Sequence, residues 1–122
     1  MDSFFFDPEV ERLPPESTRI LDLRAKPYPD GRRVRIELDL TPFLKRPLIE
    51  LALTDQNDAQ CGTASLVEPM GWKLELTMHI RSQSSSPSDL VTGQYSLLAV
   101  LTYPDLGEID RRSITFDLST NE

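Results

Sequence analysis

Hydrophobic and polar residues alternate along several short stretches of the chain, with the period of two that predicts β-strands. The clearest stretch is 33–40, in which aliphatic residues alternate strictly with charged ones. The alternation predicts strands at about 18–26, 33–40, 48–54, 61–67, 72–80, 90–103 and 109–118. No long segment keeps a helical period. The pattern therefore predicts an all-β chain of seven or eight strands, arranged as two packed antiparallel sheets.

The stretch 90–103 predicts one long strand at the centre of a sheet, because both of its faces carry apolar residues. One parity forms a row of apolar side chains that we expect to face the core: Tyr95, Leu97, Ala99, Leu101 and Tyr103. The other parity places Leu98 and Val100 on the opposite face. A strand that is apolar on both faces is typical of the middle of a sheet.

This strand opens with Leu90-Val91-Thr92-Gly93-Gln94-Tyr95, which resembles the entry to strand F of immunoglobulin-like and fibronectin type III-like sandwiches. The resemblance implies an immunoglobulin-like two-sheet antiparallel β-sandwich of seven or eight strands. It also implies that Tyr95 packs on Leu90 and that its hydroxyl bonds the backbone of residues 90–92. The paired cysteines of antibody domains are absent, and Trp72 lies too late in the chain to match their core tryptophan. The resemblance is to the general sandwich, which does not determine a function.

Length and charge narrow the classes of partner. The chain has 122 residues, a usual length for one domain, and a formal net charge of -7. Such an acidic chain is a poor ligand for nucleic acid or for an anionic membrane surface. No segment has the apolar length of a membrane span, and the N-terminus lacks the features of a signal peptide, so we expect a cytoplasmic protein. We expect an irregular arm at 1–17, a sandwich domain at 18–118 and a frayed end at 119–122.

Residues that carry catalytic or metal chemistry are few. His79 is the only histidine and Cys61 the only cysteine, too few for a zinc site. His79 shares the polar parity of its strand, so we expect a surface histidine, and we expect Cys61 to be a small buried side chain. The segment 55–58 predicts a polar turn rather than a calcium loop. The sequence therefore predicts no catalytic residue, no metal and no cofactor, and a protein that is not an enzyme.

The main functional hypothesis is a non-catalytic protein-interaction or accessory module. If the central strand pairs with strand 48–54, Ala52 lies beside Leu98 and Val100 on an outward apolar face. Two elements could cover such a face: the aromatic run of the N-terminal arm, or a protein partner or second copy of the chain. The predicted binding residues are accordingly Phe4, Phe5, Phe6, Ala52, Leu98 and Val100.

The alternative hypothesis is a sandwich that binds carbohydrate or another small polar molecule. Trp72, Tyr28 and Tyr103 could form an aromatic platform for a sugar ring. Against this, Trp72 shares the parity of core residues in its strand, and the two tyrosines precede Pro-Asp turns. The two hypotheses differ in the exposed surface that they require: a flat apolar sheet face, or a concave site lined by aromatic rings.

Overall fold

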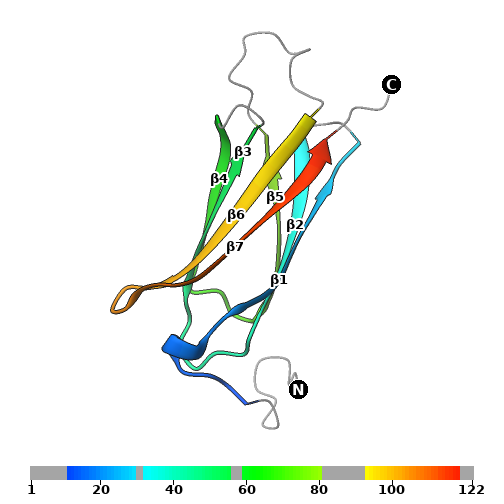
Figure 1. Cartoon of the computed structure of the whole chain (residues 1–122). Helices are drawn as coiled ribbons and strands as arrows, with labels where there is room; N and C mark the ends of the chain where they lie inside the picture. Colours follow the sequence, from blue (N-terminus) through cyan, green and yellow to red (C-terminus); the bar gives the residue numbers. More distant parts are fainter. Residues whose placement is uncertain (1–10, 30–31, 56–58, 81–92, 119–122) are drawn as a thin grey trace, which may run out of the picture.

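The computed structural model describes residues 11–29, 32–55, 59–80 and 93–118, and these residues form two antiparallel sheets packed face to face (Figure 1). A single 3-10 turn, η1, spans Pro15–Ser17. The strands are β1 Ile20–Pro27, β2 Arg33–Leu40, β3 Leu48–Thr54, β4 Gln60–Val67, β5 Lys73–His79, β6 Gly93–Tyr103 and β7 Gly107–Leu118. One sheet has the order β1-β2-β5 and the other the order β4-β3-β6-β7. The predicted β-sandwich is therefore confirmed, with seven strands in the described part of the chain.

The core lies between the two sheets and is built by the predicted alternation. In β2 the four aliphatic residues are almost fully buried, while the charged residues between them point outward. The inner face of β6 is buried in the same way along its whole length. A strictly alternating strand such as β2 has only one register that buries its apolar side chains, which explains why the sequence pattern predicted it so well. In β6 the outward Leu98 and Val100 are apolar too, and its inward row is the buried one, as predicted.

Strand β1 begins with a β-bulge that explains an irregularity in the sequence. Ile20 pairs with Leu40, whereas Asp22 pairs with Asp39, so Leu21 is the extra residue. The bulge turns both Ile20 and Leu23 toward the core and leaves Leu21 exposed. Ile20 and Leu23 are three residues apart and so stand on opposite parities in the sequence, and the bulge explains how both can face the core.

Strand β6 is the centre of the larger sheet, between β3 and β7. Its register places Leu98 directly opposite Ala52 of β3, as the sequence predicted. The strand begins at Gly93; the predicted first residues, 90–92, lie outside the described residues, as do the backbone partners expected for the Tyr95 hydroxyl. Tyr95 itself is buried and stacks on Phe116 with ring centroids 5.9 Å apart.

The two ends of the sandwich differ in their loops. The hairpin between β6 and β7 turns tightly at Gly107, whose φ of 84° suits a residue without a Cβ. Near this hairpin lies the 41–47 loop, since Lys45 Nζ contacts Asp105 Oδ2 at 3.3 Å. The turn after β4 joins them, because the Glu68 N–H donates to the Pro47 carbonyl at 3.1 Å. These loops therefore gather at one end of the sandwich, the lower end in Figure 1.

Candidate binding surfaces

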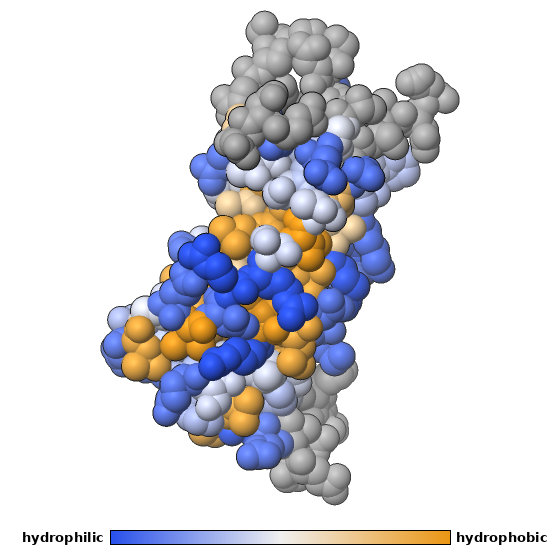
Figure 2. Space-filling model, viewed as in Figure 1, coloured by the Kyte–Doolittle hydropathy of each residue, from blue (hydrophilic) through white to orange (hydrophobic). Residues whose placement is uncertain are grey.

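The outer face of the larger sheet carries the predicted apolar strip. Ala52, Leu98 and Val100 are all half-buried, and Glu50 and Arg111 flank Val100 in the same row of the sheet. The Arg111 guanidinium is held by Glu108, with nitrogen–oxygen distances of 2.7 Å. Figure 2 shows the result on this side of the molecule: apolar patches interrupted by charged groups. The structure thus brings together three of the six predicted binding residues, in a narrow strip with a charged border.

The other three predicted binding residues, Phe4, Phe5 and Phe6, lie outside the described residues. Whether the arm covers the strip therefore stays a prediction.

The aromatic platform proposed for a sugar is wrong, because its members lie apart. Tyr103 is only 1% exposed, and its hydroxyl donates to the Lys45 carbonyl at 2.7 Å. Trp72 is half-buried at the same end of the molecule and meets Phe43 edge to face. Tyr28 follows β1 at the opposite end, where the Arg33 guanidinium lies 4.4 Å from its ring centre. Parity alone could not separate these positions, because it gives the face of a strand but not the end of the sheet.

The outer face of the smaller sheet is a ladder of charged groups. Arg24 of β1 is its centre and contacts the carboxylates of Asp22, Glu37 and Asp39. Arg35 of β2 pairs with Glu75 of β5. The hydrogen bond from Arg24 lowers the pKa of the Glu37 carboxyl below its usual value.

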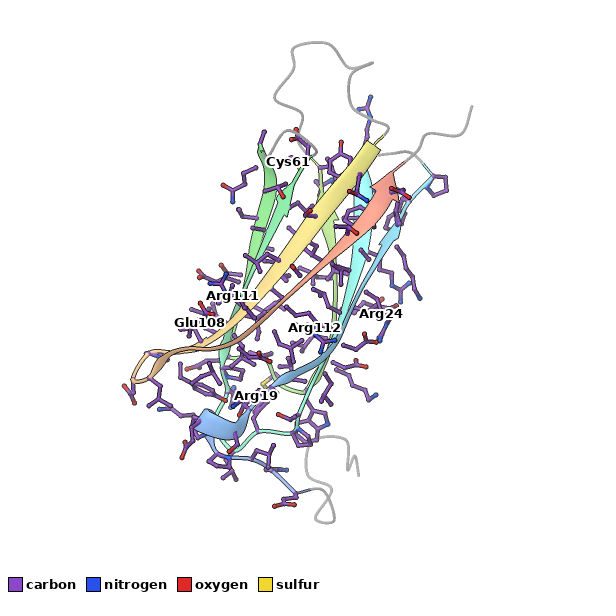
Figure 3. All side chains as sticks on the ribbon, viewed as in Figure 1. Arg19, Arg24, Cys61, Glu108, Arg111 and Arg112 are labelled. Carbon is purple, nitrogen blue, oxygen red and sulfur yellow. The ribbon has the colours of Figure 1, made fainter. Side chains whose placement is uncertain are left out.

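A shallow hollow of about 250 Å³ opens on this ladder. Its walls come from all three strands: Arg24, Glu37, Asp39, Lys73, Leu74 and Glu75. Figure 3 shows Arg24 on the β1 side of the molecule, far from Glu108 and Arg111. The sequence placed the charged side chains among these on the polar parity of their strands, but it did not identify them as a site. The register of three strands is what assembles them.

A larger groove, of about 430 Å³, separates the edges of β4 and β5. It is lined by Gln60, Cys61, Gly62, Thr63, Ala64, Thr77, Met78 and His79. The Cys61 thiol is buried and lies 3.6 Å from the Leu53 carbonyl, to which it donates. Burial raises its pKa to about 11, so the thiol stays protonated at neutral pH and is a poor nucleophile.

His79 is exposed, as predicted for a surface histidine. Among the described residues, no group of three or more His, Cys, Asp or Glu side chains is placed to hold a metal ion. The described residues also include no helix long and apolar enough to cross a membrane.

Exposed apolar side chains gather at the loop end. Of the large hydrophobic residues that are exposed in the described chain, four belong to the loops and strand ends there: Leu44, Val67, Met70 and Leu106. The Arg46 guanidinium contacts the Met70 sulfur at 3.4 Å and links two of these loops. A cluster of this kind is a candidate docking surface, and the alternation pattern did not predict it because it falls in the connections.

Comparison with protein families found no match, and comparison with curated proteins found none either. Solved structures do match. A glycosyl hydrolase family 2 member from Bacteroides cellulosilyticus DSM 14838 aligns with 83% of this chain and 15% of its own, at 13% identity and a TM-score of 0.56. A β-glucuronidase from Ruminococcus gnavus aligns with 83% of this chain and 16% of its own, at 11% identity and a TM-score of 0.52.

A family 76 glycoside hydrolase from a bovine Bacteroides thetaiotaomicron strain aligns with 82% of this chain and 20% of its own, at 15% identity and a TM-score of 0.56. These identities establish a shared fold only. The chain spans a fifth or less of the length of each of these enzymes. Its two-sheet sandwich is thus similar to one part of each glycoside hydrolase.

Proposed function

We propose that this chain is a non-catalytic, immunoglobulin-like accessory sandwich that binds carbohydrate or a similar polar ligand. The observation that carries the proposal is the match of most of this chain to a small part of several glycoside hydrolases. In each of these enzymes the matching part is a fifth or less of the chain. This support favours the carbohydrate hypothesis over a general protein-interaction module.

The charged hollow is the surface whose chemistry best suits a sugar. Adjacent sugar hydroxyls both donate and accept hydrogen bonds. Carboxylates are acceptors, while Arg24 and Lys73 supply only donors, so the hollow presents both kinds. One of the matched structures is a β-glucuronidase in complex with D-glucuronic acid. Glycans that contain uronic acids are therefore the first ligands to test, followed by neutral polysaccharides.

The test is affinity electrophoresis and titration calorimetry of the purified chain with both kinds of polysaccharide. We expect retardation of the wild type, and loss of binding in a Lys73→Ala/Glu75→Gln variant. Arg111→Ala is the matched control, because it removes an exposed ion-paired cation on the opposite sheet. If the wild type binds none of the polysaccharides, or if Arg111→Ala loses as much binding as the double variant, the proposal is wrong.

A second candidate function is docking to a protein partner, and the exposed apolar cluster at the loop end favours it. Affinity purification from the native host would compare the wild type with a Leu44→Ser/Met70→Ser variant and with Leu98→Arg. A protein retained by the wild type and lost from one variant supports docking at that surface. Proteins that all three retain equally contradict it.

A further inference from the structure

In the described part of the chain no strand pairs with the outer edge of β4, and this edge differs from the other edges of the sandwich. The edge strands are β1 and β5 in one sheet and β4 and β7 in the other. Strands β1, β5 and β7 all carry charged residues, whereas β4, with the sequence Gln-Cys-Gly-Thr-Ala-Ser-Leu-Val, has neither a charge nor a proline. Charges and prolines are the usual means by which proteins prevent an edge strand from pairing with another chain.

The opposite side of the sandwich shows how such an edge is closed. There β7 runs beside β1, and two of its charged side chains bond the β1 backbone. The Ile20 N–H donates to Asp110 Oδ2 at 2.9 Å, and Arg112 donates to the Leu21 carbonyl at 3.2 Å. Strand β1 also has a bulge at Leu21 and ends at Pro27. Strand β4 also has a bulge, at Cys61, but from Gly62 to Val67 its pairing with β3 is regular and it carries no charge and no proline.

The ladder between β3 and β4 determines which backbone groups the free edge presents. The Glu68 N–H donates to the Pro47 carbonyl, which continues the pairing of Leu48 with Val67. In an antiparallel ladder, alternate residues direct both backbone groups to the same neighbour. Gly62, Ala64 and Leu66 therefore bond β3. Thr63 and Ser65 direct their N–H and C=O groups away from β3, toward the open edge.

We propose that β4 pairs antiparallel with β4 of a second copy of this chain, which would join two four-stranded sheets into one of eight strands. In such an isologous contact the strand pairs with its own copy, so a charged residue near the centre of the strand would lie close to the same charge on the second copy. A strand without charge avoids this repulsion in an otherwise acidic chain with a net charge of -7.

The groove beside β4 favours the same occupant. With Thr63 opposite Ser65 of the second copy, Gly62 stands opposite Leu66 of that copy. Gly62 borders the groove of about 430 Å³, which the added strand would cover. The largest inward side chain of β4, Leu66, then lies beside its smallest residue. Gly62 is closely packed within its own chain, since a Cβ there would lie 3.1 Å from the His79 carbonyl oxygen and 3.2 Å from Leu53 Cδ1, so the second copy meets no side chain at this position.

The experiment measures mass and edge protection on the full chain. Sedimentation equilibrium at high micromolar concentration should give twice the 13.9 kDa chain mass. Amide exchange followed by NMR should show that the Thr63 and Ser65 N–H groups become protected as concentration rises. Ser65→Pro removes a donor that β3 does not use, and Ser65→Lys adds a charge, so each should raise the dissociation constant about tenfold or more.

Ser113→Lys is the matched control, because Ser113 is an exposed serine of β7, at the other edge of the same sheet. It should leave the dimer intact. Thermal unfolding of each variant establishes that it folds. If Ser65→Pro does not fold, Ser65→Lys alone tests the interface. A monomeric wild type with freely exchanging Thr63 and Ser65 amides overturns the proposal. So does a dimer that survives both Ser65 variants, or one that only Leu98→Arg disrupts.

Discussion

Tyr103→Phe removes a single oxygen atom from the buried junction at the loop end. The Tyr103 hydroxyl donates to the Lys45 carbonyl at 2.7 Å and lies 3.3 Å from Thr18 Oγ1, which itself donates to the Pro14 carbonyl at 3.0 Å. Thr18 is fully buried. These bonds tie β6 to the 41–47 loop and to the segment before β1. The substitution leaves the partly buried Lys45 carbonyl without its side-chain donor, which should cost about 0.5–1.5 kcal/mol, the usual net contribution of such a bond.

Urea unfolding followed by fluorescence measures this cost. Thermal unfolding should show a loss of about 4 °C in melting temperature per kcal/mol for a domain of this size. Tyr28→Phe is the matched control, because the Tyr28 hydroxyl lies in an exposed contact, 3.3 Å from Thr77 Oγ1. It should change the free energy of unfolding by less than about 0.5 kcal/mol. A double-mutant cycle with Thr18→Val tests whether the two side chains act together. If Tyr103→Phe unfolds at the same urea concentration as the wild type, the junction does not stabilise the fold as argued.

Three further predictions follow from burial and charge. Leu97→Arg should prevent folding, because Leu97 is fully buried. Leu98→Arg should fold with a normal circular dichroism spectrum, because Leu98 is only half-buried. Equal effects of the two substitutions would contradict the assigned faces of β6. The Cys61 thiol should react with a thiol reagent at pH 8 only as fast as the chain unfolds. The pKa of the Cys61 thiol is raised to about 11 in the folded protein, above that of the unfolded chain. As the pH rises from 9 to 11, the free energy of unfolding should therefore fall more for the wild type than for Cys61→Ala. Arg24→Met should be less stable than the wild type at pH 7, and the difference should be smaller below about pH 4. The reason is that the lowered pKa of Glu37 contributes stability that is lost when its carboxylate is protonated. A difference in urea midpoint that does not change with pH would count against the ion pair.

The sequence predicted what depends on period and missed what depends on distant contacts. The alternation in β2 allows one face only, and the apolar residues on both faces of the central strand indicated its place in the sheet. Even the bulge at Leu21 left a trace, as a change of parity. The bond from Tyr103 to Lys45, in contrast, joins residues 58 positions apart. No local pattern reveals which carbonyl a tyrosine will reach, so the parity of β6 predicted that Tyr103 faces the core but not its bond to Lys45.

The charged ladder also bears on whether a sugar bound there would be cleaved. Glycoside hydrolysis needs a carboxylic acid that is still protonated at working pH, so its pKa must be raised, opposite a second carboxylate. Glu37 and Glu75 are cross-strand neighbours, and Arg35 contacts both. The cation contacts oppose that requirement: the bond from Arg24 lowers the pKa of Glu37. A Glu37 carboxylate that Arg24 keeps ionised favours hydrogen bonding to hydroxyls over proton donation, and this supports the proposal of a binding surface rather than a catalytic one.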